Sequence, residues 1–176
     1  MGAWNTFSFE NDAVYDAVDS TCVDEKRKKI EGCEAIAGGS TLFRKDNKEM
    51  TIRQAFGIVK PSLTGERYRK AVDYLDKDQK QDYTFAGVVL MGFGAGAAVP
   101  KKDACRAIDI LEAERSVIKD GIKKLGLTQK DVNKRLSGDE SHLVSGWVAP
   151  VSRVNRISEE IAFMNGKLKE RNLRCG

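Results

Sequence analysis

Residues 117–165 read VIKDGIKKLGLTQKDVNKRLSGDESHLVSGWVAPVSRVNRISEEIAFMN, and the fold expected for the C-terminal half rests on them. Its last part carries apolar residues at helical intervals of 3, 4 and 3, namely Val154, Ile157, Ile161 and Met164. Pro150 precedes them, and proline is favoured in the first turn of a helix. We therefore expect a helix that begins at Pro150.

Start and stop signals divide the part before Pro150 into further helices. Gly126 is placed as the stop of a helix that Asp103 begins and that Gly121 weakens or divides. Thr128 is expected to cap the next helix together with Asp131. That helix would bury Val132 and Leu136, and one or two helical turns at residues 141–147 would follow a loop.

These pieces resemble the helix-turn-helix of the lambda-repressor (Cro or XRE) type. The match spans about residues 105–170 and rests on Leu125-Gly126-Leu127-Thr128-Gln129, on Arg135-Leu136 and on Val144-Ser145-Gly146-Trp147. The resemblance implies a C-terminal bundle of four or five helices. It also implies double-stranded DNA as ligand, with the second helix of the motif in the major groove. A homodimer on a palindromic operator is the usual arrangement of such regulators.

The motif defines the candidate DNA contacts. Thr128 leaves backbone N–H groups at a helix start, which favours a phosphate, and Gln129 resembles the family glutamine that touches phosphate. Polar side chains of the second helix would face the bases, and basic side chains would neutralise phosphates. The candidate contacts are Thr128, Gln129, Lys130, Lys134, Ser141, His142, Ser145, Arg153 and Arg156, with Lys123 and Lys124 as further phosphate-neutralising groups.

The sequence departs from the family pattern at the turn. Residues 137–140 make this turn longer than usual, and Asp139 and Glu140 carry charges that phosphate repels. The side chains expected at the groove are small, so reading of the base sequence is less well supported than the fold.

The N-terminal half is expected to be a mostly helical module at residues 1–98, with the DNA-binding domain at 101–176. Helices are expected at residues 11–20, 24–37 and 64–80, the last capped by Thr64. Residues 41–52 fit a small β-hairpin or a loop that enters a helix. Residues 86–98 are apolar on all sides and predict a buried helix or strand.

Composition and motifs exclude several classes of protein. The chain has 176 residues, 41% of them hydrophobic and 32% charged, which fits an ordered protein with a mildly basic net charge of +4. No apolar run reaches the ~18 residues of a membrane span. The cysteines form no close metal-ligand cluster, so we expect no metal site. We expect four reduced thiols and a cytoplasmic protein. No catalytic constellation or complete dinucleotide-binding motif occurs, so we expect neither an enzyme nor a cofactor.

Two functions remain. The first is a sequence-specific, repressor-like regulator of a phage or bacterial kind, in which residues 1–98 serve dimerisation or partner binding. The alternative is a protein-interaction or inhibitor module acting through residues 1–98, where the acidic start and most aromatic residues lie. In that case the helix-turn-helix serves as scaffold or in autoregulation.

Overall fold

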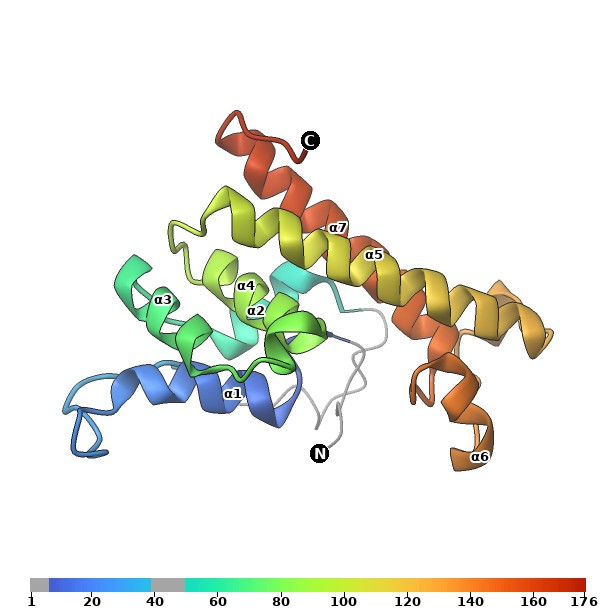
Figure 1. The fold of residues 1–176 in the computed structure, drawn as a ribbon, viewed down its shortest axis with the longest axis horizontal. Helices are drawn as coiled ribbons and strands as arrows, with labels where there is room; N and C mark the ends of the chain where they lie inside the picture. Colours follow the sequence, from blue (N-terminus) through green and yellow to red (C-terminus); the bar gives the residue numbers. More distant parts are fainter. Residues whose placement is uncertain (1–6, 39–49) are drawn as a thin grey trace.

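A computed structural model describes residues 7–38 and 50–176, and these residues form a mainly α-helical structure. Its longest elements are α5 (Lys101–Lys124) and α7 (Pro150–Glu170), which lie side by side and run in opposite directions (Figure 1). Pro150 is the first residue of α7, as its sequence predicts. The facing sides are apolar, with Ile108, Leu111 and Ile118 on α5 and Ile157, Ile161, Met164 and Leu168 on α7.

Four helices of the N-terminal half cover one end of this pair (Figure 1). They are α1 (Asp12–Asp19), α2 (Ile52–Val59), α3 (Gly65–Tyr74) and α4 (Tyr83–Gly94). The apolar segment expected at residues 86–98 belongs largely to α4, which is buried from Thr84 to Phe93 and packs against α1, α3, α5 and α7. Asn11, Thr51 and Thr64 cap α1, α2 and α3 with their side chains.

The two expected modules share one hydrophobic core. The core cluster runs from Phe7 to Leu168, and its members come from both halves of the chain. Hydrogen bonds also join the halves: the backbone N–H of Ile52 donates to Glu159 at 2.6 Å, and Tyr68 Oη donates to Asp103 at 3.0 Å. The full chain is therefore the unit to use in binding and stability measurements.

Two helices differ from expectation. The helix expected at 24–37 is absent, because Asp24 Oδ1 accepts the N–H groups of Lys26 and Lys28 and so holds the chain in a turn. α3 ends at Tyr74 instead of residue 80, since Asp76 and Gln79 cap each other and a short 3-10 helix begins at Gln79. The hairpin or loop expected at 41–52 falls mostly on residues 39–49, outside the described residues.

The cysteines form two disulfides, so the expectation of four reduced thiols is wrong. Cys22 is bonded to Cys33, and Cys105 to Cys175. The second bond holds the C-terminal tail against the first turns of α5. Sequence spacing alone does not show either pairing, because it does not show which cysteines the fold brings together. Among the described residues, no helix is long and apolar enough to cross a bilayer.

Candidate nucleic-acid interface

The segment between α5 and α7, where the sequence predicts a helix-turn-helix, lies at one end of the long helical pair (Figure 1). Its helices are short: η4 (Gln129–Asp131), α6 (Gly138–Ser141) and η5 (His142–Val144). A first helix extending through Val132 and Leu136 is therefore wrong. The second helix of the motif also has too few turns to fill a major groove as a regular recognition helix does.

The end of α5 and the next cap follow the sequence signals. Gly126 has φ +67° and its N–H donates to the Lys123 carbonyl, which ends α5 as expected. Thr128 and Asp131 form the expected capping box, with the Thr128 N–H donating to Asp131 Oδ2 at 2.7 Å. This hydrogen bond is the main reason that the pKa of Asp131 lies below its ordinary value.

A backbone contact explains why the capped helix stops early. The Leu136 N–H donates to the Val148 carbonyl at 2.7 Å, and Leu136 is buried. This bond pairs the chain at Leu136 with the residues just before α7. A continued helix would use the Leu136 N–H internally instead.

The short helix η5 packs closely on α5. The chain beyond it turns at Ser145 and Gly146, which have φ +57° and +82°. Val144 is fully buried, and a Cβ added at Gly121 would lie 2.0 Å from the Leu143 carbonyl oxygen. Gly121 does not divide α5, which is continuous. Its hydrogen atom is instead the only side chain small enough for this approach.

Six of the nine candidate DNA contacts are exposed, namely Thr128, Gln129, Lys130, Lys134, His142 and Ser145. Gln129 is held in place by Asn155 of α7, whose Nδ2 donates to Gln129 Oε1 at 3.3 Å. The described residues therefore present these six groups to solvent at the same end of the molecule.

The other three candidates are buried, and the structure removes them from a DNA-contacting surface. Ser141 Oγ donates to the Gly138 carbonyl. Arg156 is 5% exposed, lies over the Phe7 ring at 3.7 Å and pairs with Glu159 at 2.6 Å. These contacts stabilise the positions of α6 and α7, and they leave the side chains unavailable to DNA.

Arg153 is the largest fully buried side chain of the described residues. Its Nη2 lies 2.9 Å from Glu114 Oε2, and its Nη1 lies 3.3 Å from Glu160 Oε2. The guanidinium also lies 4.3 Å from the ring centre of Trp147, whose Nε1 donates to Glu114 at 2.7 Å. We call Arg153, Glu114, Glu160 and Trp147, together with Ser8, the buried arginine cluster.

Sequence reasoning missed the two acids of this cluster. Glu160 is fully buried and accepts hydrogen bonds from both the N–H and the Oγ of Ser8 at 2.6 Å. Burial raises the pKa of Glu160, and the charge of Arg153 opposes that rise. The seven-residue separation of Arg153 and Glu160 is a helical spacing that can indicate such a pair.

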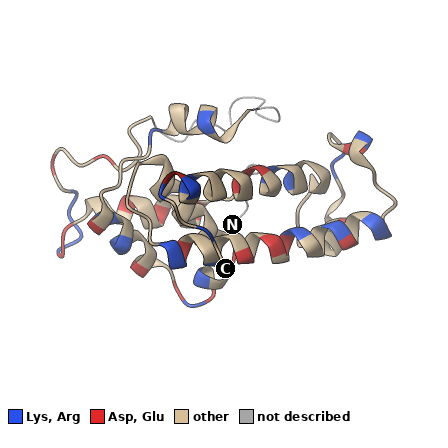
Figure 2. Cartoon of the chain, turned by 90° about the horizontal axis from the view of Figure 1, so that it is seen from above, with Lys and Arg blue, Asp and Glu red and all other residues tan. Residues whose placement is uncertain are grey.

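Basic side chains gather on the exposed end of the structure. We call this set the distal basic surface; it consists of Lys119, Lys123, Lys124, Lys130, Lys134 and Arg135, all exposed. No described acidic residue forms an ion pair with any of them. Figure 2 shows basic positions at the end of α5 and in the segment that follows it. Asp120, Asp139 and Glu140 lie in the same region and reduce its net charge.

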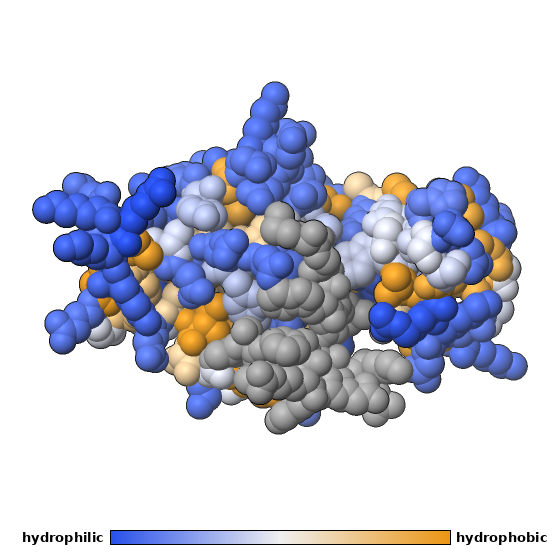
Figure 3. Space-filling view, turned by 90° about the horizontal axis from the view of Figure 1, so that it is seen from below, coloured by the Kyte–Doolittle hydropathy of each residue, from blue (hydrophilic) through white to orange (hydrophobic). Residues whose placement is uncertain are grey.

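Hydrophilic side chains cover much of both ends of the molecule on the face seen in Figure 3. The described residues contain no group of His, Cys, Asp or Glu suited to a metal ion. No family model matches this chain, and neither the curated proteins nor the solved structures give a match.

Proposed function

We propose that the protein binds double-stranded DNA through the distal basic surface and acts as a regulator. The observation that supports this proposal is the set of six exposed basic side chains without ion-pair partners among the described residues. Such groups release condensed counterions from DNA when they approach phosphates, and this release provides affinity.

Phosphate contacts carry most of the binding in this proposal. The exposed groups of Gln129, His142 and Ser145 can donate or accept hydrogen bonds at base edges, but they lie on or next to short helical turns. We therefore propose a modest preference for the operator over other DNA. Binding as a homodimer on a palindrome belongs to the same proposal.

Two observations bear on the expected cytoplasmic location and on the alternative function as a protein-interaction module. Disulfides persist mainly in oxidising compartments, so the two disulfides weigh against a reducing cytoplasm. Most of the described aromatic residues of the N-terminal half lie in the core, Tyr74 being exposed. Buried aromatic side chains do not contact a partner, so this placement weakens the alternative function, which relies on the aromatic residues of that half. Binding to a protein partner is one outcome of the DNA-binding test.

Charge removal at the distal basic surface tests the proposal. We expect the variant Lys123→Gln/Lys124→Gln/Lys130→Gln/Lys134→Gln to bind DNA at least about a thousandfold more weakly at roughly 100 mM salt. Its salt slope should fall by about three to four, because each lost phosphate contact removes about 0.9 from the slope. Fluorescence anisotropy with a labelled duplex from the promoter of the protein's own gene measures both.

The opposite end of the helical pair offers a control with the same loss of charge. Lys101, Lys102, Lys169 and Arg174 are exposed there, and replacing them with glutamine should leave the affinity within about threefold of the original. Equal losses in the two variants would mean that net charge, not this surface, controls binding. No binding by the unmodified protein, together with capture of a defined protein partner, would favour the alternative function.

A further inference from the structure

The Cys22–Cys33 disulfide joins η1 (Ser20–Cys22) to the exposed loop that follows it. Its two sulfur atoms differ in access. The Cys22 residue is 5% exposed, whereas Cys33 is half-buried. Cys33 lines two surface cavities, of about 680 and 400 Å³, and Cys22 lines only the smaller one. A small reagent from solvent therefore reaches Cys33 from two sides.

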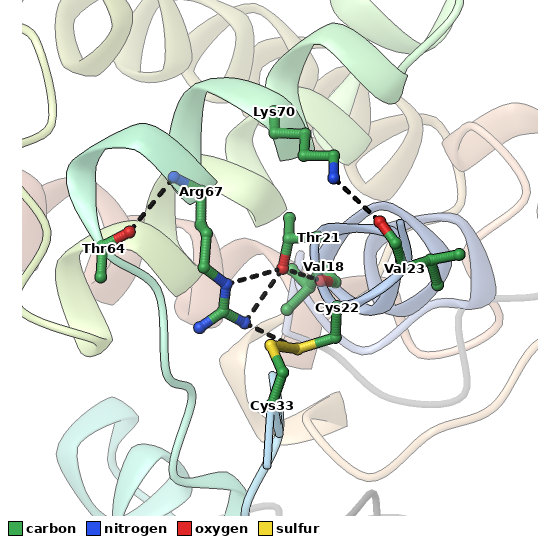
Figure 4. Close-up of a disulfide and its surroundings, with 8 residues drawn as sticks. All are labelled: Val18, Thr21, Cys22, Val23, Cys33, Thr64, Arg67 and Lys70. Carbon is green, nitrogen blue, oxygen red and sulfur yellow. Dashed lines mark hydrogen bonds between the residues drawn. A yellow bond between two sulfur atoms is a disulfide. The ribbon is translucent and has the colours of Figure 1, made fainter. Parts of the chain in front are cut away.

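A guanidinium group is fixed against the other sulfur. Arg67 of α3 lies with Nη2 3.0 Å from Cys22 Sγ (Figure 4). Its Nη2 and Nε also donate to Thr21 Oγ1 at 3.0 and 3.2 Å. Lys70, one helical turn further along α3, donates to the Val23 carbonyl at 3.0 Å. These bonds fix the guanidinium in hydrogen-bond contact with Cys22 Sγ, while Arg67 also lines the larger cavity together with Cys33.

This asymmetry determines how the disulfide would break. In thiol–disulfide exchange, one sulfur is attacked and the other leaves as a thiolate, and a thiol of lower pKa leaves faster. A neighbouring arginine stabilises a thiolate and lowers the pKa of its thiol. Cys22 beside Arg67 is therefore suited to leave, and the more accessible Cys33 is suited to be attacked.

We propose that Cys22–Cys33 is an exchange-active disulfide that reacts with small thiols of the glutathione class. The incoming thiolate forms a bond to Cys33 Sγ, the Cys33–Cys22 bond breaks, and its electron pair leaves on Cys22. A second small thiolate then attacks the mixed disulfide, which releases Cys33 as thiolate and the two small thiols as their disulfide. The reaction frees the loop at residues 23–32 and makes Cys33 a site of S-thiolation.

The second disulfide provides a comparison within the same molecule. Cys105 and Cys175 are both half-buried, so small thiols can reach them. Among the described residues, no side chain donates a hydrogen bond to either of these sulfurs. Neither sulfur therefore has a hydrogen-bonded cation, like Arg67 at Cys22, that would stabilise it as the leaving thiolate.

The test follows both disulfides of the full chain in buffered glutathione. Samples are quenched with acid, alkylated at low pH and mapped by mass spectrometry. We expect Cys22–Cys33 to open about tenfold faster than Cys105–Cys175, with glutathione on Cys33 and the alkyl group on Cys22 in the first product. Arg67→Gln should slow opening about tenfold, whereas Arg67→Lys should keep most of the rate.

Arg69→Gln is the matched control, because Arg69 is an exposed residue of the same helix, and its variant should react like the original protein. The rate at Cys105–Cys175 reports whether each variant is folded and should not change. The proposal is overturned if glutathione is found on Cys22, if Arg67→Gln opens at the original rate, or if both disulfides open equally fast.

Discussion

Arg153→Met is expected to lower the free energy of unfolding by about 3–5 kcal/mol, as found when one partner of a buried ion pair is removed. Methionine can fill much of the space, but it leaves Glu160 fully buried without the guanidinium that now lies 3.3 Å away. The ring of Trp147 loses its cation as well. Chemical denaturation at about pH 7 measures the loss.

The pH dependence identifies the cause of that loss. Burial raises the folded-state pKa of Glu160 above its ordinary value, and removing Arg153 should raise it further. A group with a raised folded-state pKa destabilises the fold as pH rises from its unfolded pKa toward its folded pKa. We therefore expect the variant to lose less stability at about pH 5 than at about pH 7.

An exposed basic residue of the distal basic surface serves as control. Lys130→Met should change the free energy of unfolding by no more than about 0.5 kcal/mol, because Lys130 is exposed and forms no ion pair with a described residue. A loss below about 1 kcal/mol for Arg153→Met would contradict the structural role assigned to the buried arginine cluster.

Gly121→Ala should cost about 3 kcal/mol of stability, at the upper end of the range for overpacked cores. The added Cβ would meet the Leu143 carbonyl oxygen at 2.0 Å and Val144 Cγ1 at 2.7 Å. The first of these is a backbone atom, so the whole segment of η5 must move away from α5. Denaturation gives the total loss, and hydrogen exchange should show faster exchange at residues 138–147.

A second helical glycine provides the matched control. Gly166 lies in α7 with nothing within 4 Å of an added Cβ. Because alanine is the better helix former, Gly166→Ala should stabilise the protein by about 0.5–1 kcal/mol. Equal effects of the two substitutions would show that η5 does not pack on Gly121 as described.

The sequence predicts the elements whose signals are local. The apolar spacing of α7, its start at Pro150, the stop at Gly126 and the cap at Thr128 all appear in the structure. The helix predicted at residues 24–37 is wrong, since the turn at Asp24 overrides a weak helical pattern there. Apolar periodicity does not show this competition, in which an aspartate side chain accepts nearby backbone N–H groups in place of the helix.

In the candidate site, too, the sequence predicts some features, whereas others depend on residues far away in the sequence. Gln129, Lys130 and Lys134 lie exposed at the surface, as their polar and charged residue types suggest. Arg153 does not, because its role depends on Glu114 and Ser8, which are 39 and 145 positions away in the sequence. A basic residue is usually exposed, so its type alone predicts a surface position. The length of the helix capped by Thr128 likewise depends on the contact of Leu136 with Val148, which lies twelve positions further along the sequence.

A salt series on the unmodified full chain tests whether the distal basic surface binds DNA. Fluorescence anisotropy with the promoter duplex, between about 50 and 200 mM salt, should give a slope of log K against log salt of about −4 to −5. A random duplex of equal length should bind more weakly with a similar slope. Absence of binding to both duplexes at about 50 mM salt, or a slope near zero, would contradict the claim.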